Sequence, residues 1–155
     1  MKTIVSQLLI KSTSLVDQED IPIEFTCEGA NINPSFSFHN IPEGTQSLAL
    51  IMEDPDAPKR VFTHWLVWDI LPGEIIEANS TSGIQGKNDF AEIGYGGPCP
   101  PTGVHRYIFT VYALDSLMGL HQGSSKNELT EAMKGHILAS AVLTGFYRKK
   151  LKSSL

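Results

Sequence analysis

The sequence predicts a mainly β fold, an antiparallel β-sandwich with one or two peripheral helices. Short apolar segments rich in aromatic and β-branched residues recur along the chain, and clusters of Pro, Gly, Asn and Asp separate them. Only one segment has a clear helical pattern. The 155 residues contain no internal repeat and no long linker, so we expect a single domain over residues 1–155.

The strand predictions rest on alternation or on short continuous apolar runs. Residues 47–52 form such a run, as expected of a central strand covered on both faces, and residues 106–114 are the densest in aromatic and β-branched side chains. Trp65 and Trp68 fall on opposite faces of their strand, and we expect both in the core. Residues 79–97 read as a long polar excursion. We expect strands at residues 1–10, 21–26, 35–38, 47–52, 64–70 and 106–114.

One helix is predicted after the capping-box pattern of residues 125–128. Its apolar face comprises Leu129, Ala132 and Met133, and Gly135 is a natural stop. The following residues, 137–148, fit either a second helix or a final strand. Phe146 and Tyr147, next to a glycine, favour a strand at the end of this segment.

Charge and hydropathy exclude several classes of protein. A formal net charge of −5 argues against nucleic acid as the main partner, because phosphate backbones require a basic face. The basic residues 148–152 read as a solvated tail, with a phospholipid or nucleic-acid contact as the alternative. No run reaches the roughly 18 apolar residues of a membrane span. The start of the chain lacks a signal-peptide cleavage pattern, so we expect a cytoplasmic protein.

The two cysteines, Cys27 and Cys99, are too few for a disulfide framework and lack the spacing of a zinc site. Two free thiols are the favoured interpretation. Both cysteines lie beside Gly and Pro in loop-like sequence, so a bridge or redox pair remains the alternative.

Two segments concentrate Pro, Gly, His and acidic groups where loops are expected, residues 54–65 and 94–107. Proline fixes φ, so these loops are stiff before anything binds. Each runs directly into a predicted buried strand. Stiff loops at the end of a sheet are typical of a preformed polar pocket.

In the first loop, Asp54 and Asp56 stand two residues apart, so an extended backbone directs both to one side. The proline after Asp54 favours that extended conformation. His64 begins the next strand within reach of this loop, where a carboxylate would orient its imidazole. The alternatives are that the acids simply form a turn and that the histidine is structural.

In the second loop, residues 96–103 offer glycine backbone with exposed N–H donors. His105 and Tyr107 then share one strand face, and Arg106 faces the other way. We expect the arginine to pair with an acid such as Asp69 or to cover apolar surface. If the two strands are neighbours, both loops converge.

The converged groups would suit a small anion. Imidazoles, a phenol and loop amides donate to phosphate or carboxylate oxygens. A nearby carboxylate repels an anion, so it would orient a histidine or hold an ammonium group. A zwitterion such as phosphoethanolamine satisfies both charges.

Three motifs of the chain, Asp54-Pro-Asp-Ala-Pro58, Thr63-His-Trp65 and Gly97-Pro-Cys-Pro-Pro-Thr-Gly-Val-His-Arg-Tyr107, resemble the phosphatidylethanolamine-binding protein family, which includes the Raf kinase inhibitor proteins. The likeness is strongest to its short bacterial and archaeal branch. Residues 25–29, 112–115 and 132–139 look like further signatures of this branch, so the resemblance covers nearly the whole chain.

The resemblance implies an antiparallel β-sandwich with an anion pocket at one end, and cis peptides near its loops. The positions that match the family's pocket and its rim are Asp54, Asp56, Pro58, His64, Gly97, Pro98, His105 and Tyr107. Family roles include phospholipid head-group binding, kinase inhibition and protease inhibition. We expect no counterpart of the extra C-terminal helix of the animal proteins, which weakens the case for kinase regulation.

A binding or regulatory module for a small phosphorylated or anionic ligand is therefore the favoured function, without a catalytic residue, metal or other cofactor. One alternative is a protease or kinase inhibitor that acts through surface contact, for instance by residues 79–93. A metal-assisted hydrolase using the histidines and aspartates is less favoured, because no tight ligand spacing appears. A Cys99–His105 nucleophile pair is also conceivable. A protein target of inhibition and a homodimer are the other candidate partners.

Overall fold

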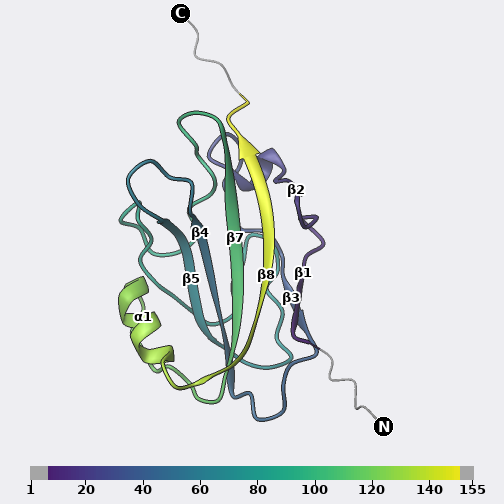
Figure 1. Cartoon of the computed structure of the whole chain (residues 1–155), viewed down its shortest axis with the longest axis vertical. Coiled ribbons are helices and arrows are strands. Elements are labelled where there is room, and N and C mark those ends of the chain that lie inside the picture. Colours follow the sequence, from purple (N-terminus) through teal and green to yellow (C-terminus); the bar gives the residue numbers. More distant parts are fainter. Residues whose placement is uncertain (1–6, 151–155) are drawn as a thin grey trace, which may run out of the picture.

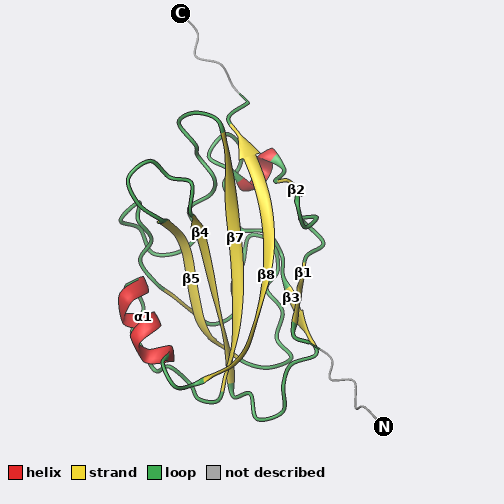
Figure 2. Ribbon diagram, in the orientation of Figure 1, coloured by secondary structure: helices red, strands yellow, loops and turns green. Residues whose placement is uncertain are grey.

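The computed structural model describes residues 7–150, and this part of the chain is mainly β, as predicted (Figures 1 and 2). A six-stranded sheet has the order β2-β8-β7-β4-β5-β6, and a two-stranded sheet pairs β1 with β3. The strands are β1 (Leu9–Lys11), β2 (Glu19–Asp20), β3 (Ser37–His39), β4 (Ser47–Asp54), β5 (Phe62–Ile70), β6 (Ile84–Gln85), β7 (Val104–Leu114) and β8 (Ile137–Arg148). The helices are the 3-10 helix η1 (Ile23–Phe25) and α1 (Lys126–Met133).

The structure corrects the predicted antiparallel sandwich. The large sheet is mixed, because β2 pairs with β8 in parallel, and the second sheet has only two strands, so the two do not form a closed sandwich. The predicted strand at residues 21–26 is also wrong. Pro22 begins η1 there, and the backbone N–H groups of Phe25 and Thr26 donate to the carbonyls of Pro22 and Ile23 instead of to a neighbouring strand.

Other predicted elements are confirmed in place. Residues 137–148 are strand throughout, because β8 pairs with β7 from Leu114↔Ile137 to Val104↔Arg148. The helix α1 begins at the predicted capping box, in which the Ser125 hydroxyl accepts from the Glu128 N–H. The predicted first strand corresponds to the short β1, and residues 1–6 and 151–155, including part of the basic tail, lie outside the described residues.

The large sheet carries a core on each face. Trp65 belongs to the core shared with β1, β3 and the 3-10 helix, and Trp68 to the core beneath α1, so their predicted opposite orientation is confirmed. Figure 1 shows α1 beside β5, with the small sheet beside β8. Fully or almost fully buried members of the first core include Leu48, Leu50, Met52, Val67, Phe109 and Val111, and the second contains Ala49, Ile51, Leu66, Leu114, Leu129 and Met133.

A β-bulge in β5 decides where His64 points. Met52 pairs with Trp65, but its neighbour Glu53 pairs with Thr63, so the register skips His64. An extra residue of this kind reverses the alternation and re-aims side chains, as bulges beside functional sites commonly do. Phe62 and His64 consequently lie on the face of Trp65, whereas Thr63 lies on the face of α1.

The loops before β5 and before β7 lie at the same end of the sheet (Figure 1), because β4 pairs antiparallel with both strands. A disulfide between Cys27 and Cys99 ties this end together, with a Cα–Cα distance of 5.5 Å. The favoured interpretation of two free thiols was therefore wrong, and the alternative of a bridge holds. Its cysteines are 72 positions apart in sequence, and a bridge closing so long a loop stabilises a fold by about 2–4 kcal/mol.

Two further expectations concern the backbone. The cis peptides implied by the family resemblance are not present, since every peptide bond in the described part of the chain is trans. Within residues 7–150, no helix has the length and apolar character that a membrane span requires.

The capping box at α1 yields a stability prediction. We expect Ser125→Ala to lower the free energy of unfolding by about 1 kcal/mol, because one N–H of the first helical turn loses its side-chain acceptor. Urea unfolding followed by the fluorescence of the buried Trp65 and Trp68 measures it. The exposed Ser80, changed to alanine, is the control, and equal midpoints for the two variants would contradict a capping role.

Candidate functional site

A cavity of about 170 Å³ lies at the end of the sheet where the two predicted loops meet. Five of the eight predicted site residues line it: Asp54, Pro58, His64, His105 and Tyr107. The rest of the lining is Ala57, Phe62, Phe90, Cys99, Pro100 and Pro101. Five of the eleven lining residues are thus proline or phenylalanine, and four, Asp54, His64, His105 and Tyr107, carry polar groups.

A buried hydrogen bond joins Asp54 to His105. The Nδ1 atom of His105 lies 2.6 Å from the Asp54 Oδ2, and both side chains are less than a tenth exposed. The other carboxylate oxygen of Asp54 accepts from the Asp56 backbone N–H at 2.7 Å. Because Asp54 holds Nδ1, the remaining nitrogen of His105, Nε2, is the one left for other partners.

His64 is oriented in the same manner by a backbone group. Its Nδ1 atom lies 2.7 Å from the Gly96 carbonyl oxygen, which can only accept, so Nδ1 carries the hydrogen. Burial lowers the pKa of His64 below its usual 6.5, although the Gly96 carbonyl and the charge of Asp54 oppose the shift. The neutral ring therefore predominates at neutral pH, with Nε2 as a lone-pair acceptor that becomes a donor on protonation.

The Tyr107 ring lies near the rings of both histidines. Its ring centroid is 5.2 Å from that of His64, in an edge-on arrangement, and 6.4 Å from that of His105, nearly parallel. Burial, together with the charge of Asp54, raises the pKa of Tyr107 well above its usual 10. The phenol is therefore neutral at all ordinary pH values and can donate its O–H.

Asp56 does not line the cavity. Its carboxylate accepts two hydrogen bonds from the Arg106 guanidinium and one from the Arg106 backbone, each 2.9 Å long, and these bonds lower the pKa of Asp56 to about 2. The expected common direction of the two acids is thus wrong, and so is the pairing of Arg106 with Asp69. Asp69 instead accepts from the backbone N–H groups of Met118 and Gly119.

Gly97 and Pro98 also lie outside the cavity lining, packed against the loop that carries Cys27. The Gly97 N–H donates to the side chain of Asn31, and the Pro98 carbonyl accepts from the Cys27 N–H. A Cβ at Gly97 would lie 2.4 Å from the Phe25 carbonyl oxygen, so only glycine fits this approach. Both residues position the cavity loop against its neighbour.

Sequence reasoning missed Phe62 and Phe90. The rings of these residues pack edge-on at 4.7 Å, and both also contact the His64 ring. Phe62 could have been found, because it stands two residues before His64 on one strand. Phe90 could not, because the excursion of residues 79–97 has no periodicity that places it beside the cavity.

The catalytic alternatives each require a particular arrangement of side chains. Within residues 7–150, no three His, Cys, Asp or Glu side chains come together as a metal site. The sulfur of Cys99 is held in the disulfide, so it is not a free nucleophile for His105 in this oxidised form.

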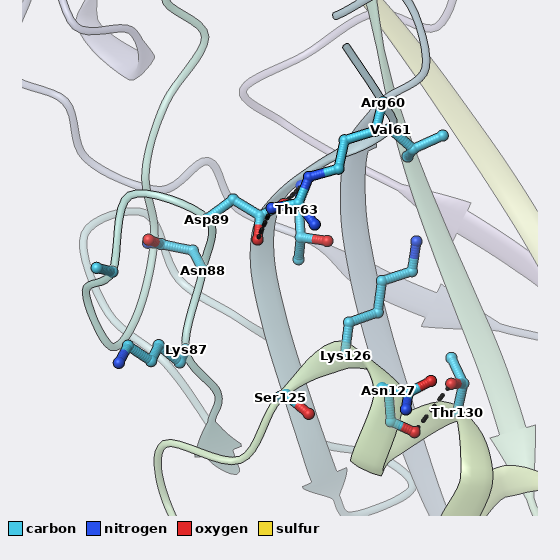
Figure 3. Close-up of a pocket in the computed structure, with 11 residues that line it drawn as sticks. Arg60, Val61, Thr63, Lys87, Asn88, Asp89, Ser125, Lys126, Asn127 and Thr130 are labelled. Atoms are coloured by element: carbon cyan, nitrogen blue, oxygen red, sulfur yellow. Dashed lines mark hydrogen bonds and ion pairs between the residues drawn. The ribbon is translucent and has the colours of Figure 1, made fainter.

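A larger groove, of about 580 Å³, lies beside the start of β5 on the face of the sheet that carries α1 (Figure 3). Three cationic residues, Arg60, Lys87 and Lys126, line it together with polar residues at the start of α1. Arg60 reaches toward Asp89 at 3.7 Å, and Lys126 pairs with Glu53.

The cavity and the groove share a wall. Asp89 forms two hydrogen bonds with Thr63 of β5. Its Oδ2 accepts from the Thr63 N–H at 2.7 Å, and its N–H donates to the Thr63 carbonyl at 2.9 Å. Asp89 and Thr63 line the groove, and the neighbouring Phe90 and His64 line the cavity. A displacement of this wall would therefore change the shape of both the cavity and the groove.

Comparisons with known proteins agree with the geometry. The family described as phosphatidylethanolamine-binding protein matches residues 11–148. A protein of Methanothermobacter thermautotrophicus, named only as a UPF0098 protein, is 45% identical over 148 residues, which cover 90% of this chain and 98% of that protein. A UPF0098 protein of Aquifex aeolicus is also 45% identical, over 89% of this chain and 86% of its own length.

Two solved structures share the fold. The putative phosphatidylethanolamine-binding protein homologue CT736 of Chlamydia trachomatis superposes with a TM-score of 0.89 at 38% identity, over 93% of this chain and 99% of its own. Escherichia coli YbcL, described as a member of the mammalian family, gives a TM-score of 0.86 at 30% identity, over 94% of this chain and 100% of its own. The chain belongs to the phosphatidylethanolamine-binding protein family.

Proposed function

We propose that the cavity binds a small phosphate-type or other anionic group, such as a phospholipid head group, and that the protein is a binding or regulatory module rather than an enzyme. The observation that carries the proposal is the pairing of two imidazoles in one cavity. Each imidazole has its Nδ1 occupied, by Gly96 and by Asp54, and each retains Nε2. Tyr107, whose ring lies near both imidazoles, offers its phenol as a further donor.

The size of the cavity limits the ligand. Pockets for drug-sized molecules have volumes of about 300–1,000 Å³, whereas this cavity has about 170 Å³. It therefore suits a compact group and would leave lipid chains outside. The rings of Phe62 and Phe90 restrict water, and hydrogen bonds to a charged ligand are stronger in such surroundings.

The charge of the cavity sets a condition on binding. Asp54 is a buried carboxylate, and it would repel an anion unless a proton is held nearby. Protonation of His64 or His105 supplies that positive charge and turns Nε2 into a donor. Phosphoethanolamine, which carries both a phosphate and an ammonium group, could match both signs of charge.

The proposed function is tested by NMR titration of the five His side chains with inorganic phosphate and with phosphoethanolamine. We expect saturable shifts in His64 and His105 and none in His39, His121 and His136. The last three do not line the cavity and serve as internal controls.

A variant separates contact with the ligand from support of the fold. His64→Asn keeps an amide donor for the Gly96 carbonyl but removes Nε2, so we expect affinity for either probe to fall at least about tenfold, the loss typical of one hydrogen bond to a charged group. Thermal unfolding of the same variant shows whether the fold is retained. If neither His64 nor His105 responds in the wild-type chain, the anion proposal is wrong.

The depressed pKa of His64 predicts a pH dependence. Only the protonated ring attracts an anion, and the free protein gains this proton below pH 6.5. We therefore expect affinity for sulfate, whose charge is constant from pH 8 to pH 5, to rise as the pH falls and to approach tenfold per pH unit on the alkaline side of the His64 pKa. Calorimetry across this range measures it, and equal affinity at both ends would refute a protonated site.

A protease or kinase inhibitor acting through surface contact is the second candidate, and the groove favours it. Two of its three cationic side chains, Arg60 and Lys126, are paired with Asp89 and Glu53, and acidic segments of a target would be attracted chiefly to Lys87. The predicted contact region, residues 79–93, contributes Lys87 and its neighbours to this groove.

The second candidate has its own prediction. In a protease or kinase assay in which the wild-type chain inhibits, Lys87→Glu should weaken inhibition several-fold, whereas His64→Asn should leave it intact. Lys11→Glu, an equal charge change on the exposed β1, is the matched control. Loss of inhibition in the His64 variant alone would assign the effect to the cavity instead.

The cytoplasmic location and the homodimer remain predictions. The disulfide argues against a cytoplasmic location, because structural disulfides are rare in reducing cytoplasm outside hyperthermophiles.

A further inference from the structure

The Cys27–Cys99 disulfide is exposed and lies beside the cavity. Both cysteines are exposed on the surface, and Cys99 also forms part of the cavity lining. Exposed disulfides are the ones that exchange readily with thiols, whereas structural disulfides are usually shielded. The bond is thus accessible to a reductant and adjacent to the proposed ligand.

Little else holds the cavity wall beside this bond. In the described part of the chain, no backbone-to-backbone hydrogen bond outside the strands involves residues 99–103. The loop is tied just before this stretch, where the Cys27 N–H donates to the Pro98 carbonyl at 3.1 Å. Pro100 and Pro101, which line the cavity, follow directly and have no N–H to donate.

The wall is also connected to the polar groups of the cavity. The backbone of Cys99 lies near the Tyr107 phenol and acts against the rise of the Tyr107 pKa that burial causes. A shift of Cys99 therefore alters both the proline wall and the environment of the central phenol.

We propose that the Cys27–Cys99 disulfide is a thiol-exchange site through which a dithiol reductant loosens the cavity wall and weakens ligand binding. The inference rests on the proposed function for its ligand, but the exchange site itself does not. The two cysteines are the only ones in the sequence, so the redox state of the chain is the state of this one bond.

The exchange is balanced as follows. A thiolate of the reductant attacks one sulfur of the disulfide, forms a mixed disulfide with it and releases the other cysteine as a thiolate. The second thiol of the reductant then attacks the mixed disulfide and releases the first cysteine. Two electrons pass to the protein, the released thiolates take up protons, and the reductant becomes a disulfide.

Reduction removes the preorganisation of the wall. In the oxidised chain residues 99–101 are already in place, whereas in the reduced chain the ligand must order them on binding. Ordering a few residues offsets part of the binding free energy, so we expect affinity to fall by about tenfold or more. The sheet beneath keeps its pairing, because β4, β5 and β7 carry their own backbone bonds.

The test measures two properties of the oxidised chain and of the chain reduced with dithiothreitol. The first is amide hydrogen exchange at Cys27 and Gly97, whose N–H groups bond to Pro98 and Asn31, with the β4 residue Leu50 as reference. The second is affinity for phosphoethanolamine. We expect exchange at Cys27 and Gly97 to accelerate at least about tenfold more than exchange at Leu50, which reports the loss of global stability, and affinity to drop.

Each outcome is decisive. Equal affinity in both redox states overturns the inference and leaves the proposed function standing. If the oxidised chain does not bind, the proposed function fails, and the exchange site is then judged by Cys27 and Gly97 alone: unchanged amides there overturn it. Equal acceleration at Leu50, Cys27 and Gly97 overturns it too, because reduction would then destabilise the fold as a whole and not the cavity wall in particular.

The double variant Cys27→Ser, Cys99→Ser provides the matched control. It should behave as the reduced chain does in both measurements, with or without dithiothreitol. A response of this variant to the reductant would trace the effect to a cause other than the disulfide and would overturn the inference.

Discussion

The antiparallel pairing of β4 with both β5 and β7 is the constraint on which the site depends. It brings the end of β4 and the starts of β5 and β7 to the same end of the sheet, and with them Asp54, His64 and His105. The 2.6 Å contact between Asp54 of β4 and His105 of β7 is possible only because these two strands are neighbours. A buried carboxylate and a buried imidazole would each be costly alone, and each satisfies the other here.

The bulge at His64 separates the two surfaces of this end. Because the register skips this residue, Phe62 and His64 face the cavity while Val61 and Thr63 face the groove beside α1. The hydrogen bond between Asp89 and Thr63 then joins the wall that the cavity and the groove share. Phe90 of the cavity and Asp89 of the groove are adjacent in sequence. A ligand that displaced Phe90 would therefore also displace Asp89 and change the shape of the groove, which would couple the two candidate functions.

Sequence alone predicted most of the polar residues that line the cavity, but not how they are connected. Period-two alternation placed His105 with Tyr107, and the proline-rich loops lie at the end of the sheet that holds the cavity. Alternation failed for Asp54 and Asp56, because the turn at residues 55–61 is not extended and Arg106 draws Asp56 away. The bulge at His64, the position of Phe90 and the Cys27–Cys99 bond all depend on contacts between distant segments, which no local pattern encodes.

The disulfide connects the question of location with the question of function. A reducing cytoplasm would favour the dithiol form of an exposed disulfide, and an oxidising compartment would preserve it. If the protein is cytoplasmic, as its sequence led us to expect, the cavity with the loosened wall is then the resting state, and oxidation is the event that organises it. His64 lines the same cavity, so its protonation and the oxidation of the cysteines would both favour the anion-bound form.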